Sequence, residues 1–381
     1  RRKEIQVNAD SPALRAARKD EHVRLATEQR ASLPPHTDFD DVQLMHHALS
    51  AIDVAAVNLA VTVNDFAWPA PIYINGMTGG TDLTGRINRE LAIAARETGI
   101  PMACGSMSVA LDDAAAVESF TVIREENPDG FVMANLGIGR SGDAARRAVE
   151  MIQADALQLH LNAVQELVMP EGARNFSSWR DSVSDIVQAS PVPVIVKEVG
   201  FGLSRSALSQ LAERGVTIAD VSGAGGTSFL SIENARRTQI DYSVLGDFGQ
   251  SAIACLLDAP AAAPTLLASG GVRHPWDVIK ALAAGAKAVG VAGTFLEVAL
   301  AGGAEELTGV INNWLEQTTG LLALLGCANP AGLSTTDLLV RGELAEFCRL
   351  RNIDLSALAT RSTETRVEDR MAHQERRREK P

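Results

Sequence analysis

Two short apolar runs, Ala156-Leu-Gln-Leu-His-Leu-Asn162 and Val192-Pro-Val-Ile-Val-Lys-Glu-Val199, enclose a segment with helical spacing. Runs of this length that end in polar or loop-forming residues are typical of buried parallel strands. Six further runs of the same kind, each followed by a helical segment, are Pro71–Thr78, Ile100–Ser106, Gly130–Leu136, Thr217–Ser222, Thr265–Gly270 and Ala288–Thr294. Eight such units in series predict a (β/α)8 TIM barrel, an α/β fold. A doubly wound sheet, which usually has fewer strands, is the second interpretation.

The predicted barrel, residues 71–300, occupies only part of the chain. Residues 1–70 form an N-terminal extension with one helix expected at about Ser11–Arg30, rich in Ala, Arg and Glu. Residues 301–360 are expected to add C-terminal helices that complete the barrel. The remaining residues, 361–381, form a tail that is almost entirely charged or polar, which is typical of a solvated end.

The composition argues against several classes of protein. A net charge of −12, a pI near 5.1 and 4% aromatic residues disfavour nucleic-acid binding. The four scattered cysteines fit reduced thiols in a cytoplasmic protein better than disulfides or zinc ligands. No apolar tract is uninterrupted enough to span a membrane, and no export signal opens the sequence. We therefore expect a cytoplasmic protein with neither membrane insertion nor a nucleic-acid partner.

Polar side chains occur along two central strands of the predicted barrel. Gln158, His160 and Asn162 alternate with leucines, so a period of two places them together on the inner face. Buried polar groups need partners, and three in one row favour a binding site over a satisfied core histidine. Lys197 lies among Val and Ile residues on the next strand. A buried lysine there indicates an anion or an electron-rich cofactor atom, with a structural ion pair as the alternative.

Glycine-rich loops follow several of the predicted strands. Ser269–Arg273 follows the seventh strand and Val291–Thr294 the eighth, and in this fold these two loops commonly bind phosphate through backbone N–H groups. They predict a phosphorylated cofactor or substrate. The GxGxxG pattern at Gly137–Gly142 is weak support for a nicotinamide site, because Asp155, the acidic residue at the required distance, precedes the next strand instead of ending it.

Taken together, these motifs closely resemble the type 2 isopentenyl diphosphate isomerases, which are FMN-dependent (β/α)8 enzymes. The resemblance covers about residues 15–345. The segments that carry it are Arg18-Lys-Asp-Glu-His22, Tyr73-Ile-Asn-Gly-Met-Thr-Gly-Gly80, His160-Leu-Asn-Ala-Val-Gln-Glu-Leu-Val-Met-Pro-Glu-Gly172, Lys197-Glu-Val-Gly-Phe-Gly202, Ser222-Gly-Ala-Gly-Gly-Thr227, Glu233-Asn-Ala-Arg-Arg237, Gly270-Gly-Val-Arg273 and Ala292-Gly293.

The resemblance implies a set of site residues. Those that match the family's FMN contacts are Met77, Thr78, Gly79, Ser106, Asn135, Lys197, Ser222, Thr227, Gly271, Arg273, Ala292 and Gly293. Those that match the positions holding the substrate diphosphate are Arg18, Lys19 and His160, the first two forming a clamp in the N-terminal extension. Gln165 matches a substrate-contacting residue of the reaction centre that positions or relays protons, and Glu166 matches the Mg²⁺ ligand. Lys197 is expected to pair with the anionic reduced flavin.

The activity implied by the resemblance is the reversible isomerisation of isopentenyl diphosphate to dimethylallyl diphosphate in isoprenoid biosynthesis. Moving the double bond requires one proton added and one removed, with no net electron transfer. We therefore expect redox-neutral catalysis in which reduced FMN supplies the acid and base, with NADPH or NADH as the reductant. We also expect a homo-oligomer, either a tetramer or an octamer.

Three departures from the family pattern keep alternatives open. Ala173 stands where an Asp is usual, Phe248 where a Trp is common and Met107 where a Gln is frequent. A divergent member that acts on a related prenyl diphosphate is therefore one alternative. Another is an FMN-dependent 2-hydroxy-acid oxidase or dehydrogenase, which would need a His beside an Arg after the sixth strand, and Ser222–Thr227 contains neither. A non-enzymatic flavin-binding or scaffold protein is the third.

Overall fold

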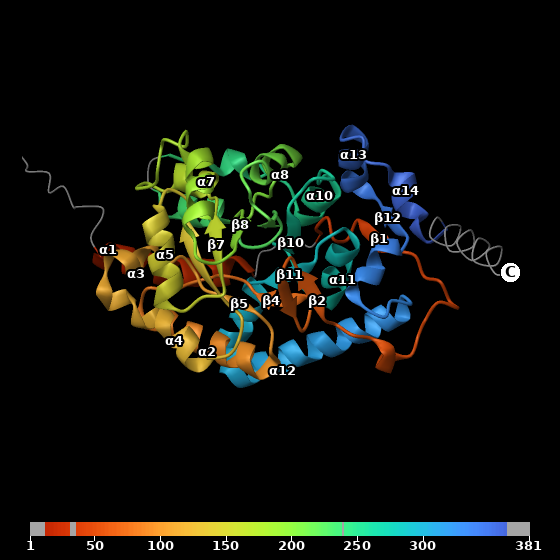
Figure 1. Cartoon of the computed structure of the whole chain (residues 1–381). Coiled ribbons are helices and arrows are strands. Elements are labelled where there is room, and N and C mark those ends of the chain that lie inside the picture. The colour runs from red at the N-terminus through yellow and green to blue at the C-terminus, as the bar shows by residue number, and fades with distance from the viewer. Residues whose placement is uncertain (1–11, 31–35, 238–239, 364–381) are drawn as a thin grey trace, which may run out of the picture.

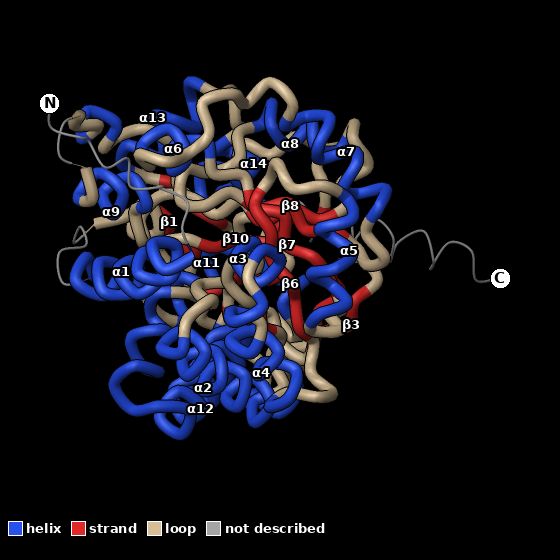
Figure 2. Tube along the Cα trace, turned by 90° about the vertical axis from the view of Figure 1, so that its left-hand side faces the viewer, coloured by secondary structure: helices blue, strands red, loops and turns tan. Residues whose placement is uncertain are grey.

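The computed structural model describes residues 12–30, 36–237 and 240–363, and its centre is a closed barrel of eight parallel strands (Figures 1 and 2). The strands are β4 (Ile72–Ile74), β5 (Met102–Ala103), β6 (Val132–Gly137), β7 (Ala156–His160), β8 (Val194–Lys197), β9 (Ile218–Asp220), β10 (Thr265–Ser269) and β11 (Ala288–Val291). Val289 of β11 pairs with Ile72 of β4, which closes the ring. All eight predicted strands are therefore confirmed, and the doubly wound sheet is wrong.

Helices surround the strands, as Figure 2 shows in blue around the red core. They are α2 (Asp82–Thr98), α3 (Ser108–Asp112), α4 (Glu118–Glu126), α5 (Gly142–Met151), α6 (Ala163–Val168), α7 (Trp179–Ala189), α8 (Arg205–Ala212), α9 (Phe229–Ala235), α10 (Ala252–Leu257), α11 (Pro275–Ala283) and α12 (Gly293–Leu324), with the 3-10 turns η2 (Ala114–Ala116) and η3 (Ser243–Leu245). α2 shows why these segments form helices around the barrel. A capping box at Thr81 begins the helix, and Ile87 and Leu91 bury one of its faces against the barrel.

The last barrel helix, α12, runs beside α2 along the lower side of Figure 1. Its backbone departs from helical geometry at Gly303, where φ is 68° and ψ is −159°. Only glycine adopts this region readily, so the residue divides α12 into a short barrel helix and a longer C-terminal helix. The last barrel helix therefore continues into the C-terminal segment.

A hairpin of β2 (Val61–Val63) and β3 (Phe66–Trp68) closes the barrel at the amino ends of its strands. Its turn residue Asn64 has φ 52°, a conformation that Asn tolerates. Trp68 is 1% exposed and packs on Tyr73 of β4 with ring centroids 5.6 Å apart. Because this end is packed with apolar side chains, chemistry is restricted to the opposite end.

The part of the N-terminal extension that follows its first helix meets the C-terminal segment on one side of the barrel, where two short strands lie at the right of Figure 1. β1 (Val42–Leu44) pairs antiparallel with β12 (Leu338–Val340). The other elements of these segments are α1 (Pro12–Arg30), η1 (Val54–Ala56), η4 (Pro330–Thr335), α13 (Gly342–Leu350) and α14 (Leu355–Ala359). The expected first helix is thus confirmed from Pro12 onward, and Ser11 lies outside the described residues.

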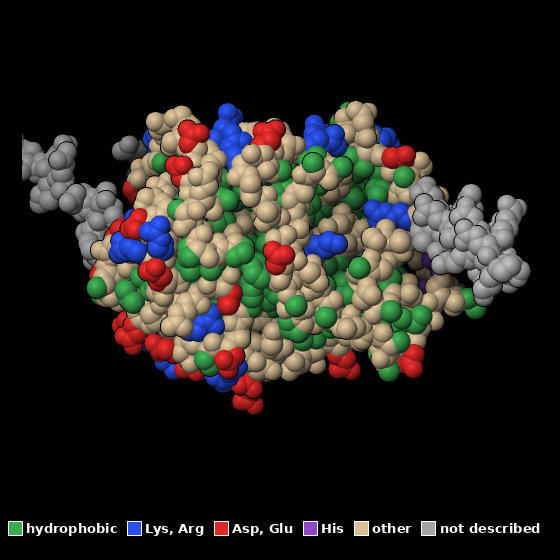
Figure 3. Space-filling model, in the orientation of Figure 1, with side chains coloured by type: hydrophobic (Ala, Val, Ile, Leu, Met, Phe, Trp, Pro, Cys, Tyr) green, Lys and Arg blue, Asp and Glu red, His purple; other side chains and the backbone are tan. Residues whose placement is uncertain are grey.

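The tail is anchored where it begins. Ser362 donates its N–H to Asp337 Oδ1 at 2.7 Å, and residues 364–381 lie outside the described residues. All four cysteines are buried and free, as expected for reduced thiols. Within the described ranges, no helix is both long and apolar enough to cross a membrane. On the face seen in Figure 3, basic and acidic side chains are interspersed.

Candidate functional site

A cavity of about 430 Å³ opens at the carboxyl ends of the barrel strands. Ligand pockets of this size are ordinary for small molecules and cofactors. Every site residue predicted from the sequence lines this cavity except Gly79. The predicted residues that line it are Arg18, Lys19, Met77, Thr78, Ser106, Asn135, His160, Gln165, Glu166, Lys197, Ser222, Thr227, Gly271, Arg273, Ala292 and Gly293.

Gly79 lies behind the cavity wall. A Cβ atom built on it would approach the ring of Phe120 within 2.2 Å, so the residue is a glycine because of close packing against α4. Residues that the sequence reasoning did not assign also line the cavity, among them His22 and Arg30 of α1 and Arg140 after β6.

A chain of buried side-chain amides runs from Asp220 to His160 across the floor of the cavity. Asn75 Nδ2 donates to Asp220 Oδ2 at 3.2 Å, and Gln158 Nε2 donates to Asn75 Oδ1 at 3.2 Å. Asn135 Nδ2 donates in turn to Gln158 Oε1 at 3.0 Å, and His160 Nδ1 lies 2.8 Å from Asn135 Oδ1. An ionised carboxylate only accepts hydrogen bonds, so it fixes the direction of every amide in the chain. The proton of neutral His160 therefore sits on Nδ1, and Nε2 presents a lone pair.

Asp220 at the end of β9 is the anionic centre of this floor and is fully buried. It accepts from Tyr73 Oη at 2.8 Å, from Ser269 Oγ at 2.9 Å and from the Ser222 N–H at 3.0 Å. Lys197 pairs with Asp220 in the β8–β9 register, and its Nζ donates to Glu198 O at 2.9 Å and Ser222 Oγ at 3.3 Å. The polar inner face predicted for these strands is confirmed.

Burial sets the protonation states of the cations in the cavity. It lowers the pKa of Lys197, while the nearby Asp220 and Glu198 carboxylates oppose the shift. Burial, followed by the charges of Lys197 and Lys19, lowers the pKa of His160 to about 3, so this imidazole is neutral at pH 7. Burial and the neighbouring Arg18 lower the pKa of Lys19 to about 8, which leaves its ammonium largely charged at neutral pH.

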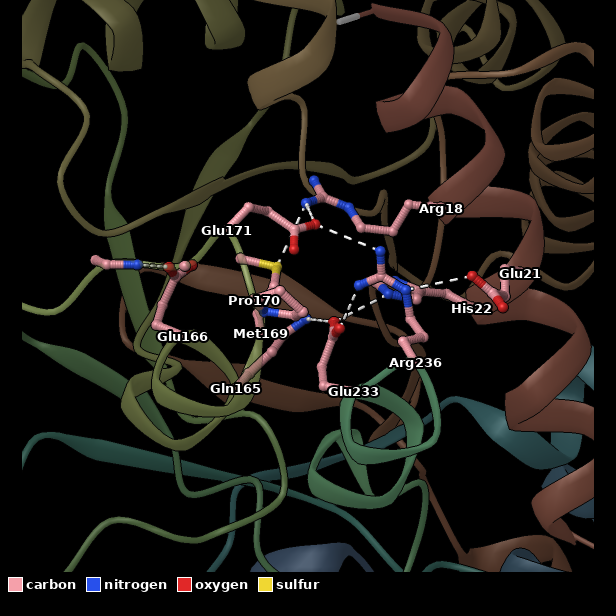
Figure 4. Close-up of polar contacts among 12 residues, drawn as sticks. Arg18, Glu21, His22, Gln165, Glu166, Met169, Pro170, Glu171, Glu233 and Arg236 are labelled. Atoms are coloured by element: carbon pink, nitrogen blue, oxygen red, sulfur yellow. Dashed lines mark hydrogen bonds and ion pairs between the residues drawn. The ribbon is translucent and has the colours of Figure 1, made fainter. Parts of the chain in front are cut away.

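Glu233 of α9 joins the reaction-centre glutamine to helix α1 (Figure 4). Its Oε1 accepts from Gln165 Nε2 at 3.2 Å and lies 3.0 Å from His22 Nε2, and its Oε2 pairs with Arg236. Burial alone would raise the pKa of Glu233, but the pairs with His22 and Arg236 outweigh it and lower the pKa to about 2. The carboxylate thus stays ionised and holds the Gln165 amide with its oxygen turned away from α9.

The arginine at the start of the predicted clamp is also held in this network. Arg18 Nη1 donates to Glu171 Oε1 at 2.8 Å, and Arg236 reaches the same oxygen at 3.4 Å. Arg236 also pairs with Glu21 of α1 at 3.2 Å, so one guanidinium connects three carboxylates from different parts of the chain, as Figure 4 shows. These contacts dock α1 over the mouth of the barrel.

Glu166 on α6 points its carboxylate at the loop that follows this helix. Oε1 accepts from Asn162 Nδ2 at 3.1 Å, and Oε2 accepts from the Ala173 N–H at 2.7 Å. Among the described residues, no group of three or more His, Cys, Asp and Glu side chains is arranged to hold a metal ion. The chain therefore presents a single oriented carboxylate at this position.

The glycine-rich loops after β9, β10 and β11 pack closely at the other end of the cavity. A Cβ atom on Gly226 would lie 2.8 Å from the Gly271 N, so these backbones approach as only glycines allow. Arg273 turns its guanidinium toward carboxylates: it meets Asp40 at 2.8 and 3.0 Å and Asp277 at 3.0 and 3.1 Å. The two pairs raise the pKa of Arg273 and hold the pKa of Asp40 well below its usual range.

Comparisons with known proteins agree with this geometry. The profile of the FMN-dependent dehydrogenase family matches residues 137–340. A protein of Nocardia farcinica (strain IFM 10152) named isopentenyl-diphosphate delta-isomerase is 53% identical, over 91% of this chain and 96% of that protein. Proteins of the same name from Kitasatospora griseola and Listeria innocua serovar 6a are 51% and 46% identical, over 93% and 91% of this chain and 98% of each relative.

A solved structure, mandelate oxidase with (S)-2-phenylpropionate, is similar to the barrel. It has a TM-score of 0.59 and 19% sequence identity, covering 84% of this chain and 90% of that one. At this level of sequence identity the similarity supports the fold only, so the chemistry has to be inferred from the residues of the site.

Proposed function

This chain belongs to the isopentenyl-diphosphate delta-isomerase family, and from that premise we propose that it interconverts isopentenyl diphosphate and dimethylallyl diphosphate in the barrel cavity. The reaction adds a proton to the terminal carbon of the alkene and removes one from C2. A site for it needs cations for the diphosphate at one point and groups that hold the alkene beside a proton donor at another.

The observation that carries the proposal is the convergence of these groups in one cavity. Arg18 and Lys19 reach it from α1, and His160, Gln165 and Glu166 reach it from β7 and α6. A diphosphate bound among them would meet two cations, and the lone pair on His160 Nε2 could accept a hydrogen bond from a protonated phosphate oxygen. Binding then places the alkene deeper in the cavity, toward the side of Lys197.

The cavity fits FMN at its phosphate end and at its floor. Gly226, Gly271 and Gly293 leave a cradle without side chains where backbone N–H groups can approach a phosphate. At the floor, contacts to Glu198 and Ser222 engage two of the three N–H groups of Lys197, which leaves one to point at a cofactor atom. When bound and reduced, FMN supplies an acid and a base that the polar side chains of this cavity do not provide.

The side chains of the reaction centre orient groups and do not themselves supply a strong acid. Gln165 donates to the ionised Glu233, which leaves its amide oxygen to accept a hydrogen bond and so to hold a proton-bearing group in place. Lys197 places its amine beside the flavin position, and the nearby Asp220 carboxylate opposes the lowering of its pKa by burial. We assign positioning roles to both Gln165 and Lys197.

We assign Mg²⁺ to Glu166. A single carboxylate with both oxygens already oriented by Asn162 and Ala173 is a weak site by itself. Mg²⁺ is usually held by one or two carboxylates together with substrate phosphates and waters, so a diphosphate between Glu166 and Arg18 would complete the coordination. Ala173, which departs from the family pattern, contributes its backbone N–H to this arrangement and no charge.

NADPH or NADH is the reductant in this proposal, and it is consumed only when the flavin becomes oxidised. The homo-oligomer and the cytoplasmic location expected from the sequence stay predictions. An FMN-dependent 2-hydroxy-acid oxidase is the second candidate, favoured by the match to the FMN-dependent dehydrogenase family. This chain lacks the catalytic base that such an oxidase needs after the sixth barrel strand, because the loop Ser222–Thr227 contains no histidine.

The experiment that tests the proposal uses the purified protein loaded with FMN. Isopentenyl diphosphate is added with Mg²⁺ and NADPH under nitrogen, and the product is followed by proton NMR. We expect the methyl signals of dimethylallyl diphosphate. Parallel samples with mandelate or lactate under air report oxygen consumption. Oxygen uptake without isomerisation would favour the oxidase. If the protein acquires no flavin absorbance, FMN is not its cofactor.

A further inference from the structure

Arg30, the last residue of α1, lies over the first residue of α12. A Cβ atom built on Gly293 would be 2.9 Å from Arg30 Nη1 and 3.6 Å from Thr227 Oγ1. Arg30, Thr227 and Gly293 all line the cavity, and Gly293 begins the helix whose N–H groups face it. Thr227 and Gly293 match FMN contacts of the family, and Gly293 also lies in a predicted phosphate loop, whereas no role was predicted for Arg30.

The end of α1 is fixed at this place by a specific contact. Ser228, the residue that caps α9, donates its N–H to Gln29 Oε1 at 2.8 Å, and Gln29 Nε2 donates back to Ser228 O at 3.3 Å. Arg30 Nε donates to Glu297 Oε2 at 2.6 Å. The Arg30 side chain is 23% exposed, whereas the Glu297 side chain is 55% exposed. Arg30 is thus held at the rim of the cavity, and its partner stands on the solvent side.

The charges at this end of the cavity show why Arg30 matters. Arg273 is the cation expected there, but its guanidinium and its backbone N–H are both engaged by carboxylates, Asp40 and Asp277. That group of three carries a net negative charge. Lys280 donates to the Phe39 O at 2.6 Å and sits beside the same carboxylates. Arg30 is therefore the guanidinium at this end whose Nη groups still face the glycine cradle.

We propose that Arg30 binds the terminal phosphate of FMN together with the backbone N–H groups of the cradle, and that Glu297, which is bound to Nε, weakens this contact by partly neutralising the guanidinium. The proposal rests on the FMN site of the proposed function. A phosphate monoester dianion matches the planar fork of a guanidinium, and two Nη groups remain after Nε has bound Glu297.

One consequence is that a single helix carries cations for two different phosphates. Arg18 and Lys19 near the start of α1 face the diphosphate end, and Arg30 at its end faces the flavin phosphate. Arg30 lies twelve residues beyond Arg18 on this helix, which separates the two ends by roughly 18 Å at 1.5 Å per residue. Cofactor binding at one end would therefore help to fix the clamp at the other.

The test compares FMN with riboflavin, which lacks the phosphate, on the apoprotein. Flavin fluorescence quenching gives the dissociation constants for the wild type, Arg30→Gln, Glu297→Gln and the double variant. Arg30→Gln should weaken FMN by about 10-fold, the low end expected for a charged hydrogen bond at a partly exposed site. Riboflavin affinity should be unchanged within about twofold. Glu297→Gln should tighten FMN by about 2- to 5-fold, and adding salt should weaken FMN less in Arg30→Gln than in the wild type.

Arg24→Gln is the matched control, because Arg24 lies on the same helix and pairs with Glu28 on its exposed side. It should leave both affinities unchanged. Equal losses for FMN and riboflavin in Arg30→Gln would overturn the proposal in favour of a packing role, and an unchanged FMN affinity would overturn it outright. If Arg30→Gln does not fold, Glu297→Gln decides, since unchanged FMN binding in that variant would contradict the proposed opposition between the Glu297 charge and the phosphate. A wild-type protein that binds neither flavin removes the proposed function, and this inference falls with it.

Discussion

Replacing Asp220 by Asn should destabilise the protein strongly. The carboxylate is fully buried and accepts hydrogen bonds from Tyr73, Asn75, Ser269 and the Ser222 N–H. An asparagine of the same shape replaces one of its two oxygens with an NH2 donor. The hydroxyls can rotate, but the Ser222 N–H and the Asn75 amide cannot both find an acceptor.

Two contributions give the expected magnitude. Leaving one buried donor facing another costs about 1–3 kcal/mol. Lys197 also loses the charge of the nearby Asp220, but the two side chains form no ion pair, so this loss adds less than the about 3–5 kcal/mol of a broken buried pair. The total, above about 1 kcal/mol and below about 8 kcal/mol, is a large fraction of the stability of a typical domain, about 5–15 kcal/mol. We therefore expect a large drop in the urea midpoint at pH 7, followed by tryptophan fluorescence.

The pH dependence separates the charge term from the hydrogen-bond term. Burial already lowers the pKa of Lys197, and Asp220 is the first group that opposes this shift, so Asp220→Asn should lower the pKa further. A lysine whose folded pKa lies below its unfolded value destabilises the fold when charged, so stability rises with pH between the two values. The deficit of Asp220→Asn relative to the wild type should therefore shrink as pH is raised from 7 toward about 10.4, the ordinary lysine value.

A double-mutant cycle with Lys197→Met completes the test. Removing both charges should cost at least about 2 kcal/mol less than the sum of the single changes, because no lone charge remains. Asp129→Asn, at an exposed loop position, is the control and should change stability by less than about 0.5 kcal/mol. A loss below about 1 kcal/mol for Asp220→Asn would show that the buried carboxylate contributes little to stability. Additive effects in the cycle would show that Asp220 and Lys197 do not interact.

Three further predictions concern the diphosphate end. Changing Arg18 and Lys19 to Ala together should keep the melting temperature within a few degrees. It should weaken apparent substrate affinity by roughly 1.5–3 kcal/mol for each charged hydrogen bond lost. A large stability loss with unchanged kinetics would instead assign the two residues to the fold and not to substrate binding. Because the pKa of Lys19 is lowered to about 8, kcat/KM should fall as pH rises through this value, and Lys19→Ala should lack this limb of the profile. Glu166→Gln should raise the Mg²⁺ concentration needed for half-maximal turnover at least about tenfold, the usual cost of an altered metal shell, and an unchanged requirement would remove Glu166 from the metal.

The barrel could be predicted because its strands are buried on both faces. Such strands appear in the sequence as short apolar runs, and the count of eight with helices between them leaves one common architecture. The hairpin β2–β3 was missed although it carries a local signal: Val61-Thr-Val63 and Phe66-Ala-Trp68 alternate around the two-residue turn Asn64-Asp65.

The site was predicted in part, and what was missed depends on pairing between strands. Lys197 was noticed because a charge stands in an apolar run, and Asp220 stands in its own run in the same way. Their pairing follows only from the β8–β9 register. The positions of Arg30, His22 and Glu233 depend on how α1 docks over the barrel, and no periodicity in the sequence encodes that packing.

The central claim, redox-neutral isomerisation with reduced flavin, is tested most directly by counting product against electrons. The FMN-loaded protein is reduced once under nitrogen with a measured amount of dithionite, and dimethylallyl diphosphate is then quantified in excess isopentenyl diphosphate and Mg²⁺. We expect many product molecules for each reducing equivalent and no activity before reduction. One product molecule or fewer per equivalent, or full activity with oxidised flavin, would contradict it.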